Sequence, residues 1–285
     1  GSKQETVQQD TIPANGKFTL TIPSKFAPYT GMSRWLITGT AQGGGLDMAI
    51  PGHNFSVTCL SDAPDTNNIV YTGFNAVNEL NSLNTQQQQI IEKFAVVSKA
   101  SVLYAKNKKL HKIFNKEKIK QKQAFETFNK QLKNNPSFNA RFLPIVNLTK
   151  GIPPHLTTNE DEKAGIYNQF ITQELNFNDL YVSGHWTAII RDWVGYQSNV
   201  VNDIAQFVKD FKLISNRITN PTQYTDFIGK LTYYLTTYGK DNYVAAIADA
   251  VVGSGKVQTY EGSMQVYIKA IMGKQAPDIV IKENV

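Results

Sequence analysis

The sequence predicts an α+β fold in which a small antiparallel β-sheet or sandwich precedes a mainly α-helical domain. Short runs with period two fill the first quarter of the 285-residue chain. Past Asn75 the apolar residues recur at helical spacing instead. Strands come first and helices follow, without βαβ alternation, which excludes a doubly wound sheet.

The β-rich part is expected over residues 11–73, where β-branched and aromatic runs are separated by turn residues. This spacing of short strands and turns is typical of antiparallel sheets. Gly43–Gly45 is expected to be a flexible turn, because no helix follows it. The predicted strands contain Phe18–Ile22, Trp35–Thr38, Phe55–Cys59 and Ile69–Tyr71.

Helices are expected wherever apolar residues recur every three or four positions. Thr157 and Glu160 have the spacing of a capping box. Asn220-Pro221 places a capping residue before a proline at the first helical position. The predicted helical segments are 90–104, 110–132, 138–148, 166–175, 186–194, 200–214, 224–235 and 244–251.

These patterns divide most of the chain into three parts. Residues 1–10 are expected to be a flexible N-terminus that opens with a cloning remnant, since the chain starts Gly1-Ser2 without methionine. Residues 11–80 form the predicted β-rich domain, and residues 81–272 form the predicted α-helical domain.

The net charge of +6 is concentrated in one segment, because residues 106–133 hold ten lysines and two acids. Leu110, Phe114, Gln121, Phe125, Phe128 and Leu132 fall on one helical face there. The segment has no arginine, the side chain that favours bidentate phosphate and base contacts, so a nucleic acid is not an expected partner. We expect a solvated helix face, with weak docking on an anionic membrane or an acidic partner as the alternative.

No catalytic, cofactor-binding or metal-binding residue is predicted. His53, His111, His155 and His185 lack the spacing of metal ligands. The single cysteine, Cys59, excludes a disulfide within this chain, and its strand parity predicts an inert thiol on the core face.

Three other patterns are explained by structure and predict no catalytic or binding site. Gly253–Lys256 lacks the flanking glycine and hydroxyl residue of a phosphate-binding loop. Trp186 and Trp193 share a helix face and are expected in the core. The acidic run Glu160–Glu162 suits the first turn of a helix, where carboxylates complement the helix dipole.

One segment near the C-terminus indicates a family. Residues Gly273–Ile281 read GKQAPDIVI, after a predicted helix end. This resembles the segment that opens the thioredoxin-like domain of TlpA-like and ResA-like thiol:disulfide oxidoreductases. Residues Ile69–Leu80, an aliphatic strand, a glycine and an asparagine-containing helix start, resemble the β-rich domain that precedes such domains in Bacteroidetes.

The resemblance implies that residues 273–285 begin a thioredoxin-like domain whose Cys-x-x-Cys would follow Val285. No catalytic residue of the family lies in this chain. The implied protein is exported to the periplasm or cell envelope, and such proteins are often lipid-anchored. The membrane is then reached only through an N-terminal anchor that precedes this sequence.

The expected function is that of a non-catalytic N-terminal module that positions or dimerises a downstream thioredoxin domain, or gives it client specificity. The expected partners are that domain, a second copy and client proteins. The alternative is a self-standing cell-envelope module that binds a glycan or peptide near Trp35 or Tyr29. A third hypothesis is a hydrolase whose active site is assembled only in the tertiary structure, from residues that no sequence motif brings together.

Overall fold

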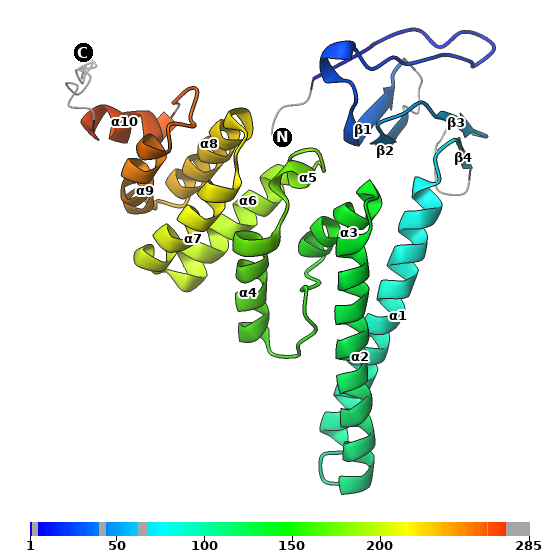
Figure 1. The fold of residues 1–285 in the computed structure, drawn as a ribbon, viewed down its shortest axis with the longest axis vertical. Helices are drawn as coiled ribbons and strands as arrows, with labels where there is room; N and C mark the ends of the chain where they lie inside the picture. Colours follow the sequence, from blue (N-terminus) through cyan, green and yellow to red (C-terminus); the bar gives the residue numbers. More distant parts are fainter. Residues whose placement is uncertain (2–4, 40–43, 62–67, 261, 272–285) are drawn as a thin grey trace, which may run out of the picture. The chain divides into compact units, whose positions relative to one another are not determined.

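The computed structural model describes residues 1, 5–39, 44–61, 68–260 and 262–271. Within these residues, short strands near the N-terminus are followed by helices, which confirms the predicted α+β class (Figure 1). None of the described helices combines the length and apolar character needed to cross a membrane.

The chain divides into two compact units. The hairpin unit comprises residues 3–167 and 182–184, and the helical unit comprises residues 1–2, 168–181 and 185–285. This division falls between Tyr167 and Asn168, inside the stretch 81–272 that was expected to form one helical domain.

The described strands form two separate antiparallel pairs. β1 (Thr30–Ile37) pairs with β2 (Gly44–Pro51), and β3 (Ser56–Cys59) pairs with β4 (Ile69–Thr72). Arg34 lies opposite Asp47, and its guanidinium donates to both carboxylate oxygens at 2.7 and 2.8 Å. These bonds lower the pKa of Asp47. The ion pair specifies the register of β1 and β2 but adds little to the free energy of unfolding, because both side chains are more than half exposed.

Two local predictions in this region are wrong. Residues Phe18–Ile22 are not a strand, because no described strand pairs with them; Phe18 instead packs against Trp35 at 6.3 Å between ring centroids. Gly44 and Gly45 belong to β2 rather than to a turn, while Gly43 lies outside the described residues. A Cβ at Gly45 would lie 3.3 Å from the carbonyl oxygen of Trp35, so glycine permits this close pairing.

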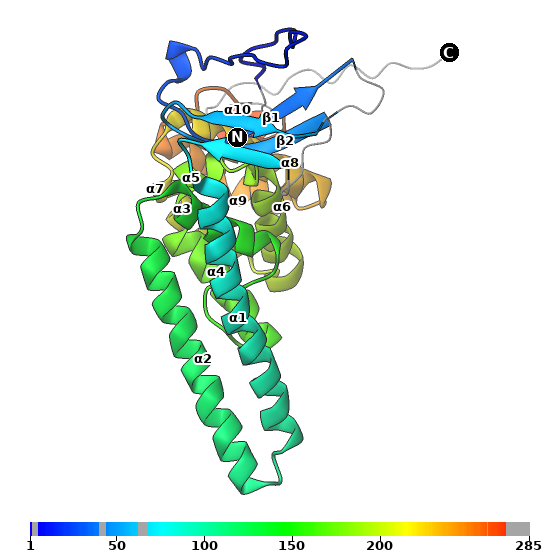
Figure 2. The same ribbon diagram turned by 90° about the vertical axis from the view of Figure 1, so that its right-hand side faces the viewer.

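A long antiparallel helical hairpin makes up much of the hairpin unit. α1 (Ala76–Leu103) starts directly after Asn75, where the period was predicted to change, and α2 (Lys108–Asn134) returns alongside it (Figures 1 and 2). The side chain of Asn107 caps α2 by accepting from the Leu110 amide at 3.2 Å. A short 3-10 helix, η1 (Ser24–Phe26), precedes the strands.

The buried face of the hairpin is the one the sequence predicted. Gln121, Phe125, Phe128 and Leu132 of α2 are buried, while Leu110 and Phe114 are half-buried. α3 (Phe138–Thr149) packs against this face through Ala140 and Leu143. Gln87 of α1 and Asn147 of α3 exchange two buried amide hydrogen bonds, at 2.9 and 2.7 Å.

The start of α4 (Glu160–Gln169) differs from the predicted capping box. Asn159 is the capping residue, because its Oδ1 accepts from the amides of Asp161 and Glu162. Thr157 lies outside the helix, where its hydroxyl accepts from the Asn159 amide and donates to Glu162. The asparagine directly before the first turn therefore acts as the cap.

The helical unit is built around aromatic side chains. Trp186, Phe207, Phe211 and Tyr224 are fully buried, and Phe211 stacks on Phe227 at 6.3 Å between centroids. Two π-turns interrupt its helices. The elements are η2 (Phe170–Glu174, π), α5 (Phe177–Tyr181), α6 (Trp186–Gly195), η3 (Tyr196–Val201, π), α7 (Ile204–Arg217), α8 (Pro221–Thr237), α9 (Asp241–Ser254) and α10 (Gly262–Ile271).

Candidate functional site

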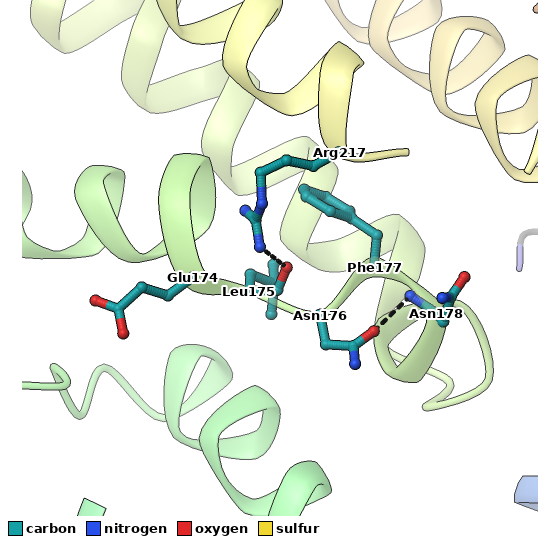
Figure 3. Close-up of a pocket in the computed structure, with 6 residues that line it drawn as sticks. All are labelled: Glu174, Leu175, Asn176, Phe177, Asn178 and Arg217. Carbon is teal, nitrogen blue, oxygen red and sulfur yellow. Dashed lines mark hydrogen bonds between the residues drawn. The ribbon is translucent and has the colours of Figure 1, made fainter. Parts of the chain in front are cut away.

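A shallow, open recess of about 220 Å³ lies in the helical unit where η2 leads into α5, beside the end of α7 (Figure 3). Ligand pockets in proteins usually measure ~300–1,000 Å³, so this recess is small for a metabolite. Its lining residues are Glu174, Leu175, Asn176, Phe177, Asn178 and Arg217.

Arg217, the last residue of α7, fixes one wall of the recess. Its guanidinium donates to the carbonyl of Leu175 at 2.6 Å and to that of Ile171 at 3.2 Å. It also lies 5.3 Å from the centre of the Phe177 ring, a cation–π distance. Burial lowers the pKa of Arg217, and the charge of Glu174 partly opposes this shift. The arginine therefore fastens the π-turn to α7.

Asn176, another lining residue, directly precedes α5 and caps its first turn. Its Oδ1 accepts from the backbone amides of Asn178 at 2.9 Å and Asp179 at 3.2 Å. The six lining residues thus offer a carboxylate, two amides and a guanidinium, but no nucleophile with an adjacent base. The recess lies beside the helix-end contacts of Arg217 and Asn176, and its side chains offer polar contacts to a ligand.

A buried polar network around Asp210 is the second distinctive feature of the helical unit. Asp210 is 4% exposed, and its carboxylate accepts from the side-chain amides of Asn168, Gln197 and Gln206 at 2.8, 2.6 and 2.9 Å. The Trp193 indole donates to Asn168 at 3.0 Å. Three amides thus replace water around this carboxylate, whose ionised form burial would otherwise disfavour.

This network joins segments that are distant in the sequence. Asn168 comes from α4, Gln197 from η3 and Asp210 from α7. Sequence reasoning missed it, because only Gln206 and Asp210 carry a local signal, their spacing of one helical turn. Gln197 Oε1 is buried without a hydrogen-bond partner, and so is the hydroxyl of Ser198, the next residue of η3. Such atoms in a polar core are typical positions for an ordered water.

The four histidines are not brought together. His53 and His155 are exposed, His111 lies in the first turn of α2, and His185 precedes α6. Across the residues that the structure describes, no group of three or more histidine, cysteine, aspartate or glutamate side chains could hold a metal ion.

The prediction that Cys59 faces the core is wrong. The thiol is exposed at the end of β3, where it donates to the carbonyl of Ser61 and to Asn68. The strand parity holds for Phe55 and Val57, which are half-buried. Cys59 differs because a two-stranded sheet offers no further layer to cover its last residue.

The two tryptophans of α6 are core residues, as predicted, since Trp186 and Trp193 are both buried. The aromatics expected to bind a ligand are less accessible than expected. Tyr29 and Trp35 are half-buried, and the Tyr29 hydroxyl donates to the Met32 carbonyl at 2.7 Å.

The glycine-rich segment after α9 terminates that helix. Gly255 adopts the left-handed conformation at the end of α9. Lys256 donates to the carbonyls of Ser215 and Ile218 at 2.6 and 2.9 Å, so its ammonium caps the end of α7. Burial lowers the pKa of Lys256. These contacts give the segment a role in packing.

The fold and the two polar features thus define an α+β protein with a helical hairpin and an aromatic helical unit. No protein-family model, curated protein or solved structure matches the chain. The segment 273–285, which carries the resemblance to thioredoxin-like proteins, lies outside the described residues.

Proposed function

We propose that this chain is the non-catalytic N-terminal module of a cell-envelope thiol:disulfide oxidoreductase. It positions or dimerises a downstream thioredoxin-like domain, or gives that domain its client specificity. The observation that carries the proposal is the sequence Gly273–Ile281. It follows the last described helix, α10, after only one intervening residue, so the helical unit would lead directly into the next domain.

The N-terminal half of the resemblance adds support. The segment from Ile69 to Leu80 was expected to contain a strand, a glycine and a helix start. The structure has β4, then Gly73 at a positive φ of 80°, then α1. Glycine suits that turn, because other residues rarely adopt positive φ.

The decisive experiment is the intact mass of the native protein in its source cells, with fragmentation of whatever follows Val285. The proposal expects an additional domain of roughly 100–150 residues that contains Cys-x-x-Cys. A native chain that ends near Val285 would overturn the proposal. Ligand screening by melting temperature would then test the alternative of a glycan- or peptide-binding module.

An activity assay tests the assignment of roles. The purified chain should reduce insulin disulfides no faster than its Cys59→Ser variant, because one thiol cannot complete a dithiol exchange. The native protein should be active, and should lose that activity when the Cys-x-x-Cys is changed to serines. Reduction of insulin by the purified chain above the Cys59→Ser control would contradict a non-catalytic role.

A further inference from the structure

The end of the helical hairpin combines positive charge with exposed apolar side chains. This hairpin end, residues 95–120, consists of the last part of α1, the turn and the first half of α2. It contains eight lysines and one glutamate, and that glutamate, Glu117, lies 3.9 Å from Lys120. Figure 2 shows both helices running to this turn, away from the strands of the same unit.

Large apolar side chains are exposed in the same place. Val102 and Leu103, in the last turn of α1, are 76% and 71% exposed. Single exposed apolar residues are ordinary on protein surfaces, but a cluster of them marks an interaction site. The exposed apolar residues of the hairpin end are Val96, Val102, Leu103, Tyr104, Ile113 and Ile119.

The turn that presents these side chains is held by internal contacts. The Ser101 hydroxyl donates to Asn115 at 3.0 Å, and His111 Nδ1 donates to the Ser101 carbonyl at 3.0 Å. Tyr104 packs on Phe114 with ring centroids 5.6 Å apart. A surface that is ordered before binding loses little conformational entropy on binding.

From this arrangement we propose that the hairpin end docks on the surface of an anionic phospholipid bilayer. Val102, Leu103 and Tyr104 enter the boundary between headgroups and acyl chains, and the lysines lie among the phosphates. Apolar insertion together with a basic cluster is the combination that retains proteins at membrane interfaces. Lysine suits this role, because its long stem reaches from an apolar position to a charged surface.

Other occupants fit the hairpin end less well. A second copy would bring two strongly positive hairpin ends together, which like-charge repulsion opposes. A nucleic acid would favour arginine for contacts to phosphates and bases, whereas the hairpin end has no arginine. An acidic polypeptide would use the lysines, but it gives no reason for the exposed Val102 and Leu103.

The proposal is independent of the proposed function, because it rests on α1 and α2 alone. A fluorophore that reports polarity, NBD, is attached to the Leu103→Cys variant in a Cys59→Ser background. Vesicles of phosphatidylcholine with phosphatidylglycerol are compared with vesicles of pure phosphatidylcholine. The matched control carries NBD at Val200→Cys, because Val200 in the helical unit is also 70% exposed. We expect a blue shift at position 103 with anionic vesicles only, and none at position 200.

Charge variants test the role of the lysines. The triple variant Lys108→Glu, Lys109→Glu, Lys112→Glu is expected to lower the affinity for anionic vesicles at least ~100-fold. The matched control is Lys150→Glu, Lys209→Glu, Lys212→Glu, which has the same net charge but changes exposed lysines outside the hairpin end. We expect its binding to anionic vesicles to be unchanged. Circular dichroism is recorded for both variants to check that they are folded.

Three results would overturn the proposal. One is the absence of a blue shift at position 103 with anionic vesicles. Another is an equal loss of binding in the two triple variants, which would show that only net charge matters. The third is that the protein binds polyglutamate more tightly than anionic vesicles and that the triple variant at the hairpin end loses this polyglutamate binding. That result would assign the surface to an acidic polypeptide.

Discussion

Asp210 shows how a single residue constrains the helical unit. A buried carboxylate is stabilised when donors surround it, and here three side-chain amides point hydrogens at its two oxygens. Removing the acceptor takes a hydrogen-bond partner from all three amides, and the fully buried Gln197 amide then keeps only its bond to Asn168 Oδ1. Leaving donors unpaired in such a site costs more stability than removing the donors and the acceptor together.

We therefore expect Asp210→Ala to lower the free energy of unfolding of the helical unit by about 3 kcal/mol. The measurement is urea unfolding followed by the fluorescence of Trp186 and Trp193 in a Trp35→Phe background. Asp249→Ala, at an exposed position of α9, is the control and should change the free energy by less than about 0.5 kcal/mol. Equal effects of the two substitutions would contradict a stabilising network.

We expect His185 to make the stability of the helical unit depend on pH in mild acid. This side chain is half-buried before α6, and burial lowers its pKa below the ordinary value of 6.5. On acidification the unfolded chain takes up the proton first. The neutral form therefore contributes stability that is fully present above pH 6.5 and is lost as the pH falls through the lowered pKa.

The free energy of unfolding of the helical unit should fall between neutral pH and about pH 5. The variant His185→Gln should reduce this dependence, whereas His155→Gln, at an exposed position, should leave it unchanged. Urea unfolding across that pH range measures the slope. An unchanged slope in His185→Gln would mean that other groups cause the pH dependence.

At the scale of single elements, asparagine caps set where helices begin. Asn220 accepts from the amides of Thr222 and Gln223 at 2.9 and 3.2 Å, and Pro221 occupies the first position of α8, as the sequence predicted. The π-turns η2 and η3 have no such local signature. They occur where Arg217 and Gln197 engage backbone and side chains of other elements.

Removal of the Asn220 cap should destabilise the helical unit. Asn220→Ala is expected to lower the free energy of unfolding by about 1 kcal/mol, because two amides of the first turn lose their acceptor. Asn220→Ser should retain most of the stability, since serine also caps helices. The same fluorescence-detected urea titration measures both, and equal stability of the alanine and serine variants would show that the cap contributes little.

At the scale of the whole molecule, each unit has a core of its own. The hairpin unit buries Phe94, Phe125 and Phe128 between its helices. The helical unit buries an aromatic cluster that includes Phe207, Phe211 and Phe227. Separate cores allow separate cooperative unfolding.

Phe211→Ala should therefore destabilise the helical unit by about 3–5 kcal/mol without loosening the hairpin. Hydrogen exchange read by mass spectrometry is the measurement. Exchange should rise in peptides from α6 to α9 and remain unchanged in peptides from α1 and α2. An equal rise in both sets would mean that the chain unfolds as one unit.

The sequence by itself determined the α+β class, the change to helical structure after Asn75, the buried face of α2 and the cap at Asn220. Each is encoded within one or two turns of chain, where residues three or four apart must share a face. The tertiary structure alone decided the pairing of the strands, the exposure of Cys59, the network around Asp210 and the division after Tyr167. These features depend on which segments, distant in the sequence, come into contact, and the local periodicity of the sequence does not specify those contacts.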